Sequence, residues 1–293
     1  MGDKFINNFK TVLLLGGLSG VILAAGALMG GRTGITIAVF IAIATNFATY
    51  FYGAKLALMS MKAQEVGPDH YLYRMTQDLA QRANLPMPKV YVSPQPAPNA
   101  FAAGRGHNAS VVCATEGLLR LLDRDELAGV MAHELAHIKH RDILISTIAA
   151  TLATVISYLG YVFMFSGGSG RNGGEAQSPF AAVGAILMIV LAPVAAIIIQ
   201  MAISRQREYA ADTEGAAICG NPLYLARALE KVHHGASRVP LDAPQSMNAM
   251  MIAEPMNLSG KSFAGLFSTH PPLEKRLMNL IGQESVGAFG RAR

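Results

Sequence analysis

Charge is scarce in this chain, and it is missing altogether from four long stretches. Only 15% of the 293 residues are Asp, Glu, Lys or Arg, whereas 52% are hydrophobic. The uncharged stretches are Thr11–Gly31, Thr33–Ala54, Ile143–Gly170 and Ala176–Ser204. Each contains about 20 largely apolar residues, enough for a helix to cross a hydrocarbon core about 30 Å thick. This composition argues against an ordinary soluble protein. The predicted transmembrane helices lie near 11–31, 33–53, 143–165 and 180–203.

Lysine and arginine are almost absent from one side of this predicted topology. Of the 24 basic residues, only Arg32 and Arg171 fall on that side. The positive-inside rule therefore places both termini and every motif-bearing segment in the cytoplasm. The net charge of +5 is mostly a consequence of this topology. The chain has no basic run with interleaved aromatic residues, so we expect no nucleic-acid partner.

Cysteine is also rare. Cys113 and Cys219 both lie in segments predicted to be cytoplasmic. Reduced, structural thiols are expected there, rather than a disulfide or a metal site.

The first apolar run has some features of a cleavable signal peptide. Lys4 and Lys10 precede it, and small residues (Ala25-Gly26-Ala27) lie near its end. However, the run is longer than a typical signal core, and a second apolar run follows after a Gly-Arg-Thr-Gly turn. A retained helical hairpin is therefore the favoured interpretation.

This topology divides the chain into two membrane hairpins and one interrupted cytoplasmic domain. Residues 1–54 form the N-terminal hairpin, and 143–203 form a second hairpin. The cytoplasmic segments 55–142 and 204–293 each look incomplete, so we expect them to pack together as one domain. Its predicted class is α+β and mostly α-helical, with a small sheet or hairpin. The loop 235–262, rich in Pro, Ser, Gly and Met, has no clean period.

Local patterns place the elements of that domain. Lys89–Ser93 alternates and reads as a strand, and Asn99–Ala103 and Ser110–Ala114 flank a Gly-rich turn typical of a β-hairpin. Thr115 and Asp123 are suited to cap two successive helices, through Leu122 and over 124–140. No Gly or Pro interrupts 130–143, so the second of these should run directly, or nearly so, into the third apolar stretch. Further helices are expected at 69–84, 205–217, 222–234 and from Pro271 onward.

The helix at 124–140 carries His133-Glu134-Leu135-Ala136-His137, an HExxH motif. Residues four apart lie on one helical face, so His133 and His137 can offer two imidazoles to one metal ion. Glu134 is then placed beside the metal, to take a proton from the attacking water. The alternative is a surface helix that happens to carry two histidines and a glutamate.

A catalytic zinc site needs three protein ligands and an open position. The best third candidate is Glu208, four residues before Asp212, although such an acidic pair is often only a solvated helix face. The second hairpin should return the chain close to where it left. From His137 to Ile143 is about 9 Å of helix, and from Ser204 to Glu208 about 6 Å. Glu208 should therefore lie at nearly the same depth as the two histidines.

With these motifs on either side of a membrane hairpin, the chain resembles the HtpX family of membrane zinc metallopeptidases, which are related to the CAAX prenyl endopeptidases. The resemblance covers essentially the whole chain. It extends to Pro98-Asn99-Ala100-Phe101, which looks like an edge strand that aligns substrate by β-addition. It also extends to a His-Pro motif at His270 and to Arg276, six residues later.

The resemblance implies a zincin-like catalytic domain with one Zn²⁺ per chain. His133, His137 and Glu208 would bind the metal, and Glu134 would be the general base. Asp212 would orient a ligand imidazole, with Arg276 nearby in the family's pattern. Asn99 and His270 would together stabilise the oxyanion that forms during the reaction.

The implied activity is that of an endopeptidase in the bacterial inner membrane, acting in quality control of damaged or misfolded membrane proteins. Its partners would be the lipid bilayer, unfolded or membrane protein substrates, and other membrane proteases. A zinc transporter or sensor is a second hypothesis, but it predicts ionisable residues inside the spans, and the four spans have none. An inert membrane scaffold or chaperone stays open.

Overall fold

A computed structural model of the chain describes residues 2–149, 205–236, 271–283 and 286. Most of the predicted second hairpin (150–203) lies outside these residues, as do almost all of the loop 235–262 and His270. The predictions for those segments therefore stay predictions.

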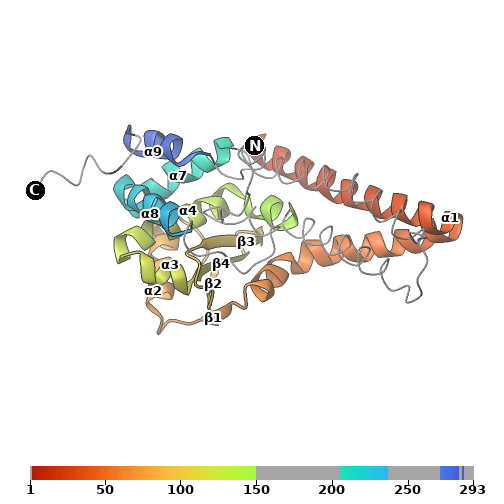
Figure 1. Cartoon of the computed structure of the whole chain (residues 1–293), viewed down its shortest axis with the longest axis horizontal. Helices are drawn as coiled ribbons and strands as arrows, with labels where there is room; N and C mark the ends of the chain where they lie inside the picture. Colours follow the sequence, from red (N-terminus) through yellow and green to blue (C-terminus); the bar gives the residue numbers. More distant parts are fainter. Residues whose placement is uncertain (1, 150–204, 237–270, 284–285, 287–293) are drawn as a thin grey trace, which may run out of the picture.

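The N-terminal helix α1 (Gly2–Ser60) is two helices joined at Gly31, where φ is 54° and ψ is −132°. Its two arms project together from the rest of the fold (Figure 1). Near the turn the arms are in backbone contact, because a Cβ on Gly34 would collide with the carbonyl oxygen of Gly26. Farther along, Asn46 Nδ2 donates to Ser19 Oγ at 2.8 Å. The predicted helical hairpin is present, and its second arm runs on to Ser60.

The surface of this hairpin is apolar. Among the described residues, every strongly exposed large hydrophobic side chain except Met278 belongs to α1. The second arm, Gly30–Ser60, is the one helix in the described part of the chain that is long and apolar enough to cross a membrane. Only 17% of its most apolar window is buried, unlike the core helix of a soluble protein. Such a surface suits contact with lipid better than contact with water.

A four-stranded sheet lies at the base of the hairpin (Figure 1). Its strands are β1 (Gln64–Val66), β2 (Lys89–Ser93), β3 (Ala100–Gly106) and β4 (Ala109–Thr115), in the order β1-β2-β4-β3. β3 and β4 form the predicted antiparallel hairpin, with Ala100 opposite Ala114. β2 is parallel to β4, and β1, which has only three residues, is antiparallel to β2. Among the strands of the described residues, β3 is therefore at an edge, as the resemblance implies.

The helix α4 (Arg124–His140) lies at the centre of the domain and packs against the sheet and three other helices. Asp123 begins it with a capping box, in which Asp123 and Glu126 bond each other's backbone N–H. The three helices that pack against α4 are α2 (Tyr71–Arg82), α7 (Arg205–Cys219) and α8 (Pro222–Ala236), and α8 in turn packs against α3 (Glu116–Leu121) and α9 (Leu273–Ile281). Thr115 caps α3 as predicted.

The passage from α4 into the third apolar stretch is interrupted. Arg141 adopts the left-handed conformation, with φ 62°, and ends the helix. Asp142 N–H bonds the carbonyl of His137 at 3.0 Å, and a new helical segment starts at Ile143. The prediction that α4 continues without a break is therefore wrong, and the alternative, that it continues after a short break, is confirmed. No Gly or Pro marks the break, because Arg141 itself takes the left-handed conformation that glycine usually supplies.

Candidate active site

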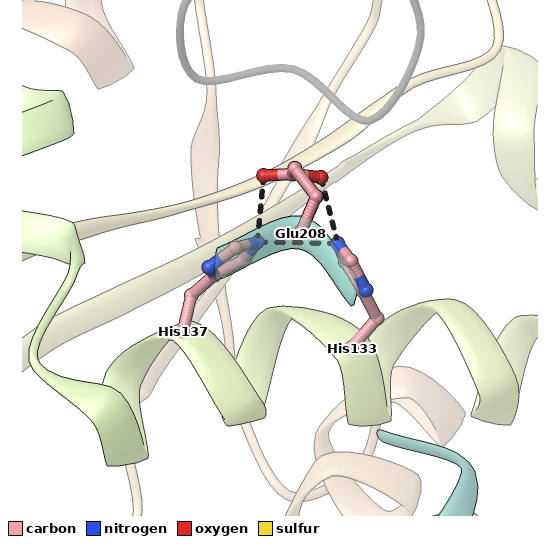
Figure 2. Close-up of side chains that lie close together, drawn as sticks. All are labelled: His133, His137 and Glu208. Atoms are coloured by element: carbon pink, nitrogen blue, oxygen red, sulfur yellow. Dashed lines mark hydrogen bonds and ion pairs between the residues drawn. The ribbon is translucent and has the colours of Figure 1, made fainter. Parts of the chain in front are cut away.

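The two histidines of the HExxH motif point from one face of α4 towards Glu208 on α7 (Figure 2). Their Nε2 atoms are 3.1 Å apart, with the rings perpendicular. One oxygen of Glu208 lies 3.8 Å from His133 Nε2, and the other lies 3.5 Å from His137 Nε2. Helices from two segments far apart in sequence therefore bring three donor groups to one point, with Glu208 at the depth that the sequence predicts.

These three residues fit a zinc ion. At Zn–N and Zn–O bond lengths near 2 Å and tetrahedral angles, neighbouring ligand atoms lie about 3.3 Å apart. The observed separations of 3.1, 3.5 and 3.8 Å bracket that value. Two imidazoles and one carboxylate also form a donor set of known catalytic zinc sites, with a fourth position left for water or substrate.

The local sequence of α7 explains how Glu208 reaches the histidines. Glu208, Asp212 and Gly215 are spaced by four and three residues, so they share one face, and that face lies against α4. At Gly215 the two backbones nearly touch, since a Cβ there would lie 2.9 Å from His133 Cα. Because Gly215 has no side chain, α7 can approach α4 closely, and the side chain of Glu208 then reaches the two histidines.

Behind His133 lies a buried pair of opposite charges. Asp212 Oδ1 is 3.0 Å from His133 Nδ1, off the axis of an ideal hydrogen bond. Arg276 on α9 donates two hydrogen bonds to Asp212, at 2.9 and 2.6 Å. Burial by itself would raise the pKa of Asp212, but Arg276 outweighs it and keeps the pKa below its usual value. Asp212 is thus held as a carboxylate facing the ring of His133.

Glu134 is buried beside the metal-binding group. Its side chain follows His133 on α4 and is only 3% exposed. Its negative charge acts on the pKa of His137 and of Arg276, and also contributes to the raised pKa of Cys113 on β4. The charge of this buried glutamate is therefore felt by groups on α4, α9 and β4.

The other predicted site residues are placed less directly. Asn99 is buried immediately before β3, and its Oδ1 accepts a hydrogen bond from Ala100 N–H. His270 lies outside the described residues.

Comparison with known proteins gives these residues a family. The model of peptidase family M48 matches residues 67–284, well over half of the chain. The chain belongs to peptidase family M48. Among its relatives, a protein named Protease HtpX homolog from Desulfatibacillum aliphaticivorans is 50% identical, over 94% of this chain and 89% of that protein. A Persephonella marina protein of the same name is 48% identical, over 94% and 96% of the two chains.

A solved structure supports the fold of this M48 peptidase. The crystal structure of Ste24p from S. mikatae aligns with a TM-score of 0.52 and 20% sequence identity. The alignment covers 95% of this chain but 65% of the other, so the chain spans about two thirds of the length of that protein. The likeness in fold therefore extends beyond residues 67–284, the part that the M48 family model matches.

One further residue beside the two histidines, Asp142, was not predicted from the sequence. Its Oδ2 lies 3.5 Å from His137 Nδ1, and Arg207 lies 3.4 Å from its Oδ1. Burial alone would lower the pKa of His137. The charges of Glu208, Asp142 and Glu134 outweigh it and raise that pKa to about 9. The sequence did contain one sign of its importance, because Asp142 is a lone carboxylate five residues after the motif, at the edge of an apolar stretch.

Proposed function

We propose that this M48 peptidase is an integral membrane zinc endopeptidase with one Zn²⁺ per chain, acting on damaged or misfolded membrane proteins. The convergence of His133, His137 and Glu208 beside the buried Glu134 carries the proposal. It supplies a metal-binding group and a base within one site, which a purely structural metal centre does not need.

Each residue has a role in the proposed reaction. His133, His137 and Glu208 would hold the ion, and zinc bound there would polarise a carbonyl and lower the pKa of water towards about 7. The carboxylate of Glu134 accepts a proton from the attacking water. The water oxygen adds to the peptide carbonyl carbon, the C–N bond breaks, and Glu134 returns the proton to the amine nitrogen. Asp212, fixed by Arg276, would accept the Nδ1 proton of His133 and so leave the Nε2 lone pair for the ion.

The proposed substrate lies along the edge strand β3. An extended peptide can add to an exposed sheet edge through main-chain hydrogen bonds, and its register is then fixed by the strand. β3 packs directly on α4, so its position is set relative to the HExxH motif. Asn99 before β3 and His270 would stabilise the negative charge that develops on the carbonyl oxygen.

The proposed location is the bacterial inner membrane, with both termini and the site in the cytoplasm. The apolar surface of α1 and the apolar arm Gly30–Ser60 support membrane insertion. The orientation rests on the distribution of Lys and Arg in the sequence. With the second hairpin inserted as well, the chain crosses the membrane four times, and the site lies about two helical turns from the bilayer surface.

Replacing Glu134 by Gln tests the chemistry. The purified full chain should cleave an unfolded model protein and a membrane protein, and a chelator should stop both reactions. Glu134→Gln should abolish cleavage while zinc content stays near one per chain, because glutamine cannot accept the proton. Glu214→Gln, on α7 but away from the site, is the matched control. Cleavage by Glu134→Gln at the wild-type rate would overturn the mechanism. Zinc binding without any cleavage by the wild type would favour a transporter or sensor.

A further inference from the structure

Asp142 occupies the two-residue break between α4 and the helical segment that starts at Ile143. Its backbone N–H bonds the carbonyl of His137, and its own carbonyl accepts from Ser146 N–H at 3.2 Å. Its side chain is only 5% exposed. The residue therefore ends one helix and begins the next, with its carboxylate turned into the protein.

That carboxylate has two partners from different helices. As an acceptor only, it receives the Nδ1 proton of His137 on Oδ2 at 3.5 Å. On Oδ1 it faces Arg207 of α7 at 3.4 Å. Arg207 immediately precedes Glu208, the carboxylate that approaches the opposite nitrogen of the same imidazole. One side chain thus contacts His137 and the neighbour of Glu208 at once.

The same arrangement lies behind the other histidine. His133 Nδ1 faces Asp212, and Arg276 holds Asp212, just as His137 Nδ1 faces Asp142 and Arg207 holds Asp142. Each imidazole of the motif therefore has an aspartate behind it, and each aspartate has an arginine. The two pairs share α7, which carries both Arg207 and Asp212, whereas Asp142 and Arg276 come from two other places in the chain.

A second ion pair between α4 and α7 shows what a merely structural contact looks like here. Lys139 on α4 pairs with Glu214 on α7 at 2.5 Å, with side chains 39% and 30% exposed. This pair joins α4 to α7, but its partners are a lysine and a glutamate and not a histidine of the motif. Asp142 differs because it is buried and its partner is the imidazole itself.

We propose that Asp142 is a positioning residue for His137. It selects the tautomer whose Nε2 lone pair faces Glu208 and His133, and through Arg207 it ties that ring to α7. The proposal rests on the zinc site described above. A carboxylate behind a ligand histidine raises its basicity and fixes its orientation, and loss of such a partner costs about 10- to 100-fold in metal affinity.

The test is Asp142→Asn in the full chain, stripped of metal and titrated with zinc against a chromophoric chelator. His137 and Arg207 face different oxygens of Asp142, and asparagine places an NH₂ donor where one of those oxygens was, so one of the two contacts is lost. We expect zinc affinity to fall about 10- to 100-fold. The visible absorption of the Co²⁺-substituted protein should also change, because the geometry around the ion changes. Glu214→Gln should leave both readouts as in the wild type.

Each outcome decides between the alternatives. Wild-type affinity and an unchanged Co²⁺ spectrum in Asp142→Asn would overturn the proposal. So would an equal loss in Glu214→Gln, since the effect would then come from general loosening of the two helices. If Asp142→Asn fails to fold, Arg207→Gln decides, with a smaller loss of zinc affinity expected and no loss overturning the proposal. A wild type that binds no zinc would instead remove the proposed function itself.

Discussion

Gly215 on α7 lies directly against the backbone of His133 on α4. A methyl group at Gly215 would come within 2.9 Å of both Cα and N of His133, closer than real Cβ atoms approach their neighbours. The two helices are thus as close as their main chains allow, at the point where the first histidine of the motif projects.

Gly215→Ala should therefore push α7 away from α4. We expect a loss of about 1–3 kcal/mol in the free energy of unfolding, typical of overpacking in a tight core, and weaker zinc binding because Glu208 moves with its helix. Gly67→Ala is the matched control, since a Cβ there meets nothing within 4 Å. Denaturant unfolding of both variants checks this. Equal stability in the two would show that the helices can separate without cost.

Glu208→Ala should remove most of the bound zinc. Two imidazoles alone leave the ion short of a protein ligand, so the metal content should fall well below one per chain. Metal analysis after gel filtration measures this. Glu214→Ala, two helical turns along α7 and paired with Lys139, should keep the wild-type content. An unchanged zinc content in Glu208→Ala would show that Glu208 is not a metal ligand.

Arg276→Met should destabilise the fold strongly. The arginine is 3% exposed and donates twice to Asp212, which is fully buried. Its removal leaves a buried carboxylate without its cation, a change that costs about 3–5 kcal/mol. Arg120→Met, which breaks the exposed pair with Glu116, should have little effect. A small effect at Arg276 would mean that Asp212 reaches solvent more easily than its burial indicates.

The thiol of Cys113 should stay protonated in the folded protein well above neutral pH. Burial, with a contribution from the charge of Glu134, raises its pKa. The thiolate is the reactive form, so iodoacetamide at pH 8 should label this cysteine only after denaturation.

The same shift makes stability depend on pH in one direction. Below about pH 8.5 the thiol is protonated in both states, and the pH has no effect through it. Above that value the unfolded chain releases the proton and the folded chain does not. Stability should then fall by about 1.4 kcal/mol per pH unit. The stability of Cys113→Ala should fall less steeply over the same pH range. Parallel slopes for the two proteins would show that the thiol ionises freely in the fold.

Features with local causes were predictable from the sequence. The β3–β4 hairpin follows from a Gly-rich turn between two alternating runs, and the start of α4 follows from the capping pattern at Asp123. The meeting of Glu208 with the histidines could also be predicted, because similar lengths of helix on either side of the predicted hairpin would place them at nearly the same depth.

Features that depend on backbone conformation or long-range contact were not predictable. Arg141 takes a left-handed conformation usually left to glycine, and Asp142 reaches His137 only because the helix ends there. β1 has three residues, too few to show a period. Gly215 looks like an ordinary helix-weakening glycine until its distance from His133 is known.

The pairing of Asp212 with Arg276 also has a consequence for the order in which the chain is made. A ribosome releases the HExxH motif long before it releases α9, the helix that carries Arg276. Until then Asp212 has no buried cation to keep it charged behind His133. An unfinished chain therefore already contains His133, His137 and Glu208 before Arg276 is available to hold Asp212 behind His133.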